Sequence, residues 1–367
     1  MPRALLRPVA VATLGLAAAL TAAAPAVASP EPWRDVSPAG AADSVFYDVE
    51  SRGGETWAVG ISIDASNAMH PYAARWTGSG WETPAQPTSG EGRLDELAVA
   101  GPDDAWAVGS AFSDRASEAV LQHWDGTAWT RIGLPLPVDA SHAGLSAVTV
   151  AGDGSAWIAA SYSTAEEFRY AVLRRDADGS WSEVPGGAEL GWLSQLQTAP
   201  DGSVYAITNT GIVRFDGTRW TGSPLPAQLD GALYDAVEVR SADDVWAVGH
   251  LRHEAFWRRP VVIHFDGHAW REVRTPAETG QLYDIAFDRQ GRPVAIGESQ
   301  NPAVSPNGDY VLTLDRTGRF THTESVPGAG YLHGATADES GRIWAVGGTN
   351  DPAGPSGLPY AFAGIRD

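Results

Sequence analysis

The segment with the clearest potential for binding chemistry spans residues 250–260 and reads HLRHEAFWRRP. It combines aromatic and cationic side chains in an otherwise acidic chain. Aromatic faces stack on sugar rings, and guanidinium groups hold polar substituents. The candidate binding residues of this segment are Arg252, His253, Trp257, Arg258 and Arg259.

Trp192 is the second candidate, because it and Trp257 are the two tryptophans that fall outside the repeat positions described below. Between them, one repeat has only residues 208–211 where the others have long loops, which predicts a notch beside both aromatics. Large aromatic side chains on loops either bind ligands or form the core of the loop itself. Two interpretations remain: a ligand surface that includes Trp192 and Trp257, or local packing with the arginines paired to nearby acids.

Acidic residues recur near the start of the first strand-like run of each repeat. The equivalent positions hold Asp48, Glu96, Ala147, Gln195, Asp235, Asp284 and Gly334. Tyr234 precedes Asp235, as tyrosine also precedes Asp48 and Asp284. Such carboxylates could bind a hard cation or act as acid and base, or they form a solvated rim that caps the strands. Because no complete ligand set is evident, we expect no metal and no cofactor.

The element that must position these residues is a unit of four strand-like runs. In one copy the runs cover residues 94–100, 105–110, 120–124 and 128–134. Asp125-Gly126 separates the last two runs, and Asp-Gly between apolar runs predicts a tight hairpin. Each unit therefore predicts a four-stranded antiparallel sheet.

An aromatic residue at the start of the second run recurs at intervals of 41 to 51 residues. Its copies are Trp57, Trp106, Trp157, Tyr205, Trp246 and Trp344, with Val294 in the one gap. The aromatic after the hairpin has only six copies at this spacing, and Trp33 supplies a seventh from upstream. The sequence thus predicts an all-β fold, a seven-bladed β-propeller of four-stranded antiparallel blades. We expect the N-terminal strand at residues 33–37 to complete the last blade and close the ring.

The order of Trp106-Ala107-Val108-Gly109, Trp124-Asp125, Trp129 and Pro135 resembles the kelch and galactose-oxidase type of β-propeller. The resemblance implies the fold over nearly all of residues 29–367. It does not bring the oxidase chemistry, since the copper-radical cofactor of that family needs a cysteine cross-linked to a tyrosine, and the chain has no cysteine.

Residues 1–28 differ from the repeats. Arg3 and Arg7 precede an apolar run at residues 9–24, and Ala26-Val27-Ala28 has the pattern of a cleavage site. This predicts a secretory signal peptide, followed by a single propeller domain at residues 29–367 in a secreted, extracellular protein. A retained membrane anchor is the alternative, and the apolar run is short for it.

The composition excludes several classes of partner. The formal net charge is −20, and the sequence contains no lysine. Nucleic acid and anionic membranes both need clustered positive charge, so neither is expected as a partner. Without cysteine there are no disulfides and no thiolate metal sites. We expect a soluble monomer without membrane insertion.

The leading hypothesis is a secreted, non-catalytic propeller that binds a carbohydrate or protein ligand on the face that carries Trp192 and Trp257. A rival is an extracellular polysaccharide lyase or glycoside hydrolase. In that case His253 or Tyr234 would be the base, Arg259 would neutralise a uronate, and Asp235 with Glu254 would form a carboxylate pair. A third hypothesis is a structural cell-surface interaction protein.

Overall fold

The computed structural model of the chain describes residues 32–38, 43–87, 90–112, 117–253, 257–277, 279–301, 303, 308–323, 325–349 and 361–366. The chain divides into two units, Met1–Pro30 and Glu31–Asp367. The first unit, with the predicted signal peptide, lies outside the described residues. Within the described part of the chain, no helix has both the length and the apolar character needed to cross a membrane.

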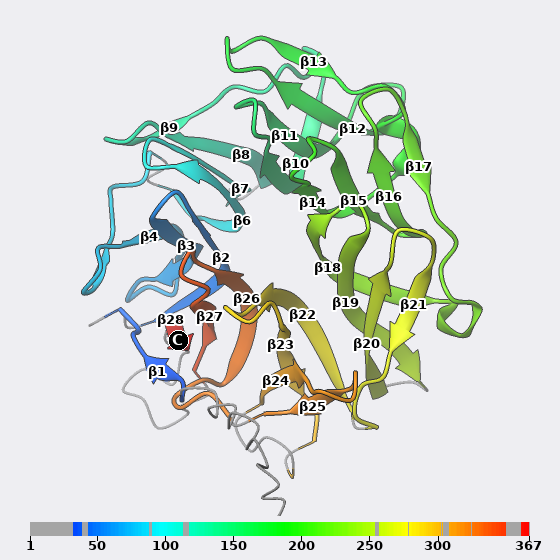
Figure 1. The fold of residues 1–367 in the computed structure, drawn as a ribbon. Helices are drawn as coiled ribbons and strands as arrows, with labels where there is room; N and C mark the ends of the chain where they lie inside the picture. The colour runs from blue at the N-terminus through cyan, green and yellow to red at the C-terminus, as the bar shows by residue number, and fades with distance from the viewer. Residues whose placement is uncertain are drawn as a thin grey trace, which may run out of the picture. The chain divides into compact units, whose positions relative to one another are not determined.

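The second unit consists of seven four-stranded antiparallel sheets (Figure 1). The innermost strands are β2 (Ser44–Arg52), β6 (Gly92–Gly101), β10 (Ser141–Val150), β14 (Leu193–Thr198), β18 (Ala232–Ser241), β22 (Gly280–Phe287) and β26 (Tyr331–Ala337). The second strands are β3 (Glu55–Ile63), β7 (Asp104–Phe112), β11 (Ala156–Ser163), β15 (Val204–Thr208), β19 (Asp244–His253), β23 (Pro293–Ser299) and β27 (Ile343–Gly348). The predicted seven-bladed propeller is confirmed.

The outer half of each sheet completes the blade. The third strands are β4 (Met69–Trp76), β8 (Ser117–Trp124), β12 (Phe168–Arg175), β16 (Gly211–Phe215), β20 (Trp257–Phe265), β24 (Asp309–Leu314) and β28 (Ala361–Arg366). The outermost strands are β5 (Trp81–Glu82), β9 (Trp129–Arg131), β13 (Trp181–Glu183), β17 (Trp220–Gly222), β21 (Trp270–Val273), β25 (Phe320–His322) and β1 (Arg34–Asp35). Two short 3-10 helices, η1 (Ala188–Leu190) and η2 (Ala227–Leu229), lie in connections between blades.

In blades 2, 4 and 5 the hairpin between the third and the outermost strand forms at the Asp-Gly sequence that predicts it. In blade 2, the Asp125 carboxylate accepts the backbone N–H groups of Thr127 and Ala128, each at 2.9 Å. Gly126 adopts a φ of +90°, which a residue with a side chain rarely does. Local turn chemistry therefore fixes where each third strand reverses.

The core is divided among the seven interfaces between neighbouring blades, each with its own hydrophobic cluster. Between blades 1 and 2, the ring of Trp57 lies 5.0 Å from Trp124 and 5.1 Å from Trp129, measured between centroids. Between blades 7 and 1, Trp344 lies 5.2 Å from Trp76. The tryptophans that mark the repeat are thus the packing units between blades.

The last blade combines both ends of the second unit. Strand β1 pairs with β28, so that Arg34 lies opposite Ile365. The side chain of Trp33 is only 6% exposed, and the guanidinium of Arg366 lies 5.1 Å from the centre of its ring. Burial of Trp33 therefore links the N-terminal strand to the interior of blades 6 and 7.

The connections between blades lie on the same face as the loops between second and third strands, because alternate strands run in opposite directions. We call this the top face; the innermost strands begin there. In blade 4, only residues 209 and 210 separate β15 from β16, as expected from the sequence. On the top face, blade 4 therefore has only a short loop between its second and third strands.

Trp33→Ala should destabilise the propeller. Removing a buried tryptophan costs about 3–5 kcal/mol through lost contacts and the cavity left behind. Urea unfolding followed by fluorescence would measure the free energy of unfolding.

Trp192→Ala is the matched control, because Trp192 is 42% exposed and its loss should change stability by less than about 0.5 kcal/mol. Equal stability of the Trp33→Ala variant and the unmodified protein would contradict the role assigned to Trp33.

Candidate functional site

Each innermost strand has a register shift near its start, where a β-bulge places an extra residue. The bulge needs close approach of the second strand. A Cβ atom added to Gly109 of β7 would overlap the carbonyl oxygen of Arg93 in β6. In blade 2 the glycine of the Trp-Ala-Val-Gly sequence thus permits this close approach, whereas blades 3 and 4 form the same bulge with Ala160 and Thr208 at the equivalent position. Bulges change the direction in which side chains point.

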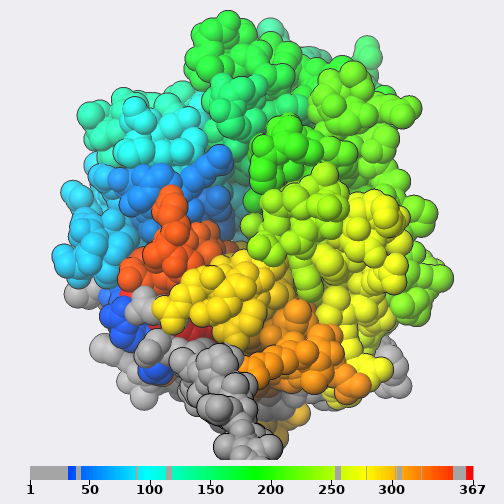
Figure 2. All heavy atoms as spheres, viewed as in Figure 1, coloured from blue at the N-terminus to red at the C-terminus, as the bar shows by residue number. Residues whose placement is uncertain are grey.

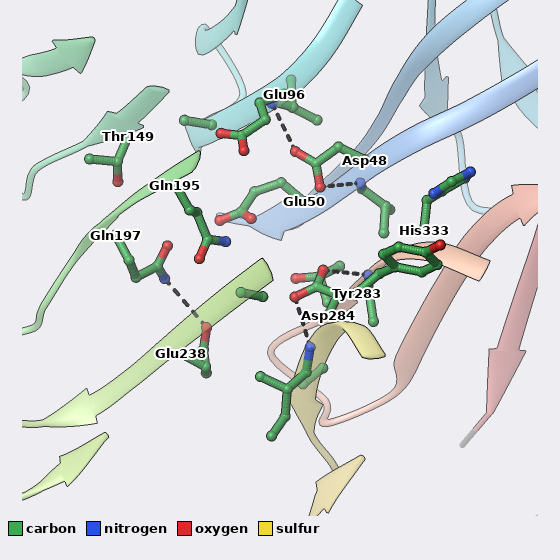
Figure 3. Close-up of a pocket in the computed structure, with 18 of the residues that line it drawn as sticks. Asp48, Glu50, Glu96, Thr149, Gln195, Gln197, Glu238, Tyr283, Asp284 and His333 are labelled. Carbon is green, nitrogen blue, oxygen red and sulfur yellow. Dashed lines mark hydrogen bonds between the residues drawn. The ribbon is translucent and has the colours of Figure 1, made fainter. Parts of the chain in front are cut away.

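The bulges surround a central cavity of about 280 Å³, which we call the channel. Its walls come from the innermost strands of all seven blades, and Figure 2 shows a hollow at the centre of one face. Polar side chains point into it (Figure 3). They are Asp48, Glu50, Glu96, Thr149, Gln195, Gln197, Glu238 and Asp284.

Several channel side chains connect neighbouring blades by accepting a backbone N–H group, among them Glu96, which accepts from Val148. Asp48 accepts from Leu97 at 2.8 Å, Asp284 from Ala335 at 2.7 Å and Gln195 from Val237 at 2.6 Å. Asp48 and Asp284 also each accept the N–H of the following residue at 2.7 Å. These contacts support the rim interpretation of the acidic residues, since each carboxylate satisfies backbone donors on two blades.

Burial raises the pKa of the channel carboxylates, because a low-dielectric site disfavours the charged form. The pKa of Asp48 rises to about 6 and that of Glu238 to about 7. Burial also raises the pKa of Glu50, Glu96 and Asp284 well above the usual range, and the nearby negative charge of Asp48 adds to each shift. The channel therefore holds protons more tightly than the unfolded chain does.

Aromatic rings gather at the top end of the channel, its mouth. The imidazole of His333 lies 5.7 Å from Tyr47, 5.3 Å from Tyr283 and 5.1 Å from Tyr331, measured between ring centroids. Burial lowers the pKa of His333 to about 4, so the ring is neutral at pH 7. The Tyr283 hydroxyl donates to the Glu298 carboxylate at 3.2 Å. Apolar ring faces and polar edges thus occur together at the mouth.

A set of four polar side chains lies beside these rings, between blades 5 and 6. The Gln281 amide donates to both oxygens of the Asp235 carboxylate at 3.3 Å, and His250 Nδ1 lies 3.3 Å from the same carboxylate. The Arg258 guanidinium donates to the Gln281 amide oxygen. We call Asp235, His250, Arg258 and Gln281 the mouth network. Asp235 lines the channel, while His250 and Gln281 are only 4% and 6% exposed.

The structure brings two of the sequence candidates together, Asp235 and Arg258, through Gln281. It places Tyr234 elsewhere: this side chain is 6% exposed in the hydrophobic cluster between blades 4 and 5. The sequence alignment of the acidic positions was wrong by one residue in blade 5. The bulge lies between Tyr234 and Ala236, so Ala236 matches Asp48, and Asp235 is the bulged residue.

The remaining candidates lie outside the mouth network. Trp192 is exposed on the top face, and Arg259 pairs with Glu272 at 2.7 Å. Arg252 is exposed on β19, opposite Arg258 in the β19–β20 ladder. His253 and Trp257 pair at the end of the same ladder, and only their backbone is described. Glu254 falls outside the described residues.

Sequence reasoning missed Glu50, Glu238 and Gln281, and it placed His250 in the segment 250–260 without its contact to Asp235. Glu50 follows Asp48 by two residues, so the two-residue period of a strand could have identified it. Gln281 carried no such sign, because its role depends on contacts between blades. Among the described residues, no group of three or more His, Asp and Glu side chains is arranged to hold a metal ion.

The pH dependence of stability should follow the channel carboxylates. In the unfolded chain their pKa values lie near 4, and in the folded chain they are higher, so the folded state binds more protons between about pH 4 and pH 7. The free energy of unfolding should therefore fall as pH rises through this range. Calorimetry at pH 5 and pH 8 should give the lower Tm at pH 8; equal Tm values would contradict the burial of these groups.

Asp48→Asn should reduce this pH dependence. The shift of the Asp48 pKa from 3.8 to about 6 corresponds to about 3 kcal/mol in total, of which about 1.4 kcal/mol is lost between pH 5 and pH 8. Asp125→Asn is the control. Hydrogen bonds from Thr127 and the neighbouring backbone lower the pKa of Asp125 to about 2, so its contribution is lost only as pH falls below about 4. The control should leave the decline between pH 5 and pH 8 intact.

Comparison with known proteins gives the fold a wider context. No family model matches the chain, and no curated protein matches it. Virginiamycin B lyase from Staphylococcus aureus, solved as a catalytically inactive variant with quinupristin, has a TM-score of 0.62 and 12% identity over 91% of this chain and 98% of that chain. YCF48 bound to D1 peptide has a TM-score of 0.58 and 15% identity over 93% and 98%.

A fungal alcohol oxidase of the AA5 family, in complex with copper, has a TM-score of 0.59 and 13% identity over 92% of this chain and 76% of that chain. At these identities the similarity shows the fold alone. The matched proteins include enzymes and a peptide-bound protein, so the scaffold fits a binding or an enzymatic role. The matches show that this chain has a β-propeller fold, but they do not confirm the kelch type.

Proposed function

We propose that the chain is a secreted, non-catalytic propeller that binds a carbohydrate on its top face. The observation that carries this proposal is the distribution of exposed apolar side chains. In the described part of the chain, five large apolar side chains are exposed, and all five lie on the top face. They are Met69, Val138, Phe168, Trp192 and Leu233. Single exposed apolar side chains are common on proteins, so the two on neighbouring blades next to the channel, Trp192 and Leu233, carry the most weight.

Trp192 and Leu233 lie closest in sequence to the channel mouth. Trp192 precedes Gln195, a channel residue, by three positions, and Leu233 precedes Asp235 by two. They belong to neighbouring blades 4 and 5, and the loop between β15 and β16 of blade 4 is only two residues long. An exposed indole therefore lies near a polar, aromatic mouth.

This combination favours a carbohydrate. A sugar ring has an apolar face, which an indole or phenol ring covers, and hydroxyl groups, which carboxylate, amide and guanidinium groups bind. The mouth offers both kinds of partner in Tyr283 and Asp235. Secretion, expected from residues 1–28, would place the protein where glycans are abundant.

A protein ligand is the alternative on the same face, since exposed apolar side chains also serve protein interfaces. YCF48, which shares the fold, was solved with a peptide. For an enzyme, the burial of Tyr234 argues against its use as a base. A panel of uronic-acid polymers, followed at the absorbance of unsaturated products, would detect a lyase.

Trp192→Ala should weaken glycan binding. A glycan array identifies the ligand, and titration calorimetry then compares the variants. Loss of stacking on one exposed indole should raise the Kd about tenfold, equivalent to about 1.4 kcal/mol.

Met69→Ala tests where on the top face the ligand binds, because Met69 is also 42% exposed but belongs to blade 1. It should leave the Kd unchanged if the site lies at blades 4 and 5, and an effect as large as that of Trp192→Ala would extend the site to blade 1. Unchanged affinity in the Trp192→Ala variant would remove Trp192 from the site. An array on which no glycan binds would overturn the carbohydrate proposal in favour of a protein ligand.

A further inference from the structure

The shape of the channel restricts how a ligand can occupy it. Its walls are formed by the innermost strands of all seven blades, so they are closed on every side. Its volume of about 280 Å³ lies just below the range of about 300–1,000 Å³ typical of small-molecule sites. A group that enters from the mouth must therefore enter end first, and it can be no larger than about one sugar ring.

Asp235 differs from the carboxylates that connect the blades. Asp48 and Asp284 accept backbone N–H groups of the next blade, whereas the described partners of Asp235 are the side chains of His250 and Gln281. The Asp235 side chain is 29% exposed at the mouth. A carboxylate oxygen accepts about two hydrogen bonds, and Oδ1 receives one, from Gln281. Asp235 thus retains the capacity to accept a further donor.

His250 indicates that the orientation of Asp235 matters. Its side chain is almost fully buried, and among the described residues its Nε2 atom has no hydrogen-bond partner. Leaving a buried polar atom unsatisfied costs stability. The contact of His250 with Asp235, supported by Gln281 and Arg258, holds the carboxylate in one position, as a binding group requires.

The charges at the mouth select against anions. Asp95 and Asp235 both line it, and Glu298 lies beside Tyr283. Arg93 pairs with Asp95, and Arg258, bonded to the neutral amide of Gln281, keeps its positive charge, so acids outnumber bases among these groups by three to two. A uronate would bring another carboxylate into this acidic surrounding, where like charges repel. Hydroxyl groups meet no such penalty.

We propose that the channel mouth binds the terminal residue of a neutral glycan end-on, with Asp235 accepting hydrogen bonds from its hydroxyl groups. His250 and Gln281 are positioning residues that act through Asp235, and Tyr283 supplies a ring face. This inference rests on the proposed carbohydrate function. It adds that the protein binds the end of the glycan and that the glycan is uncharged.

The first test uses the unmodified protein. Titration calorimetry would compare short and long members of neutral gluco-, manno-, galacto- and xylo-oligosaccharide series with oligogalacturonates. End-on binding predicts that short and long members of the series that binds have the same Kd, expressed per mole of oligosaccharide. It also predicts that oligogalacturonates do not bind. A Kd per chain that falls in proportion to length, or preferred binding of oligogalacturonates, would overturn the inference.

The second test replaces one carboxylate. Asp235→Asn should raise the Kd for the neutral oligosaccharide at least tenfold. Asp95→Asn is the matched control: Asp95 is the bulged residue of blade 2, its side chain is 27% exposed at the same mouth, and it pairs with Arg93. The control should change the Kd less than twofold.

The outcomes separate the inference from the proposed function. If Trp192→Ala weakens binding and Asp235→Asn does not, a glycan binds the top face outside the channel, and the inference is wrong while the function stands. If no oligosaccharide or arrayed glycan binds, both are wrong. If the Asp235→Asn variant fails to fold, the chain-length comparison on the unmodified protein still decides the question.

Discussion

The bulge near the start of every innermost strand is the constraint on which the channel depends. At Gly109 an added Cβ would overlap the backbone of β6, but Ala160 and Thr208 stand at the equivalent positions of blades 3 and 4, so the bulge also forms opposite a side chain. At the bulge two consecutive residues, such as Tyr47 and Asp48, both line the channel instead of alternating between faces. The bulge thus determines which side chains of the innermost strand face the axis.

The channel carboxylates stabilise the ring through hydrogen bonds, but their burial makes the charged form unfavourable. A polar side chain at the axis satisfies a backbone N–H group of the next blade, which stabilises the ring. Gln195 shows that an amide is sufficient for this contact. At other blades the same contact is made by Asp48 and Asp284, and their burial near other acids raises their pKa. The ring therefore retains titratable groups that the hydrogen bond alone does not require.

The fold followed from the sequence because its determinants are local. Asp-Gly hairpins and the recurring tryptophans specify each sheet and each interface between blades, and both are visible in a single repeat. The site followed only in part, because it depends on register and on contacts between blades. Because Asp235 is the bulged residue of blade 5, its side chain lies at the mouth, and the side chain of Tyr234 lies in the core. Gln281 and Asp235 lie on neighbouring blades and 46 positions apart in the chain. Gln281 does not stand at one of the recurring positions of the repeat, so the sequence pattern did not indicate it.

Asp48 and Asp235 differ in what holds them, and this difference bears on the binding role proposed for Asp235. Both line the channel, but Asp48 is committed to two backbone donors, so moving it would disturb two blades. Asp235 is held by side chains alone, at contacts of 3.3 Å, and can accept a ligand hydroxyl without loss of a backbone hydrogen bond. A shift of one residue at the bulge is enough to produce this difference. Under the proposed function, Asp235 can therefore serve the ligand because its partners are neutral or weakly basic side chains, whereas the bulged Asp95 of blade 2 is paired with Arg93.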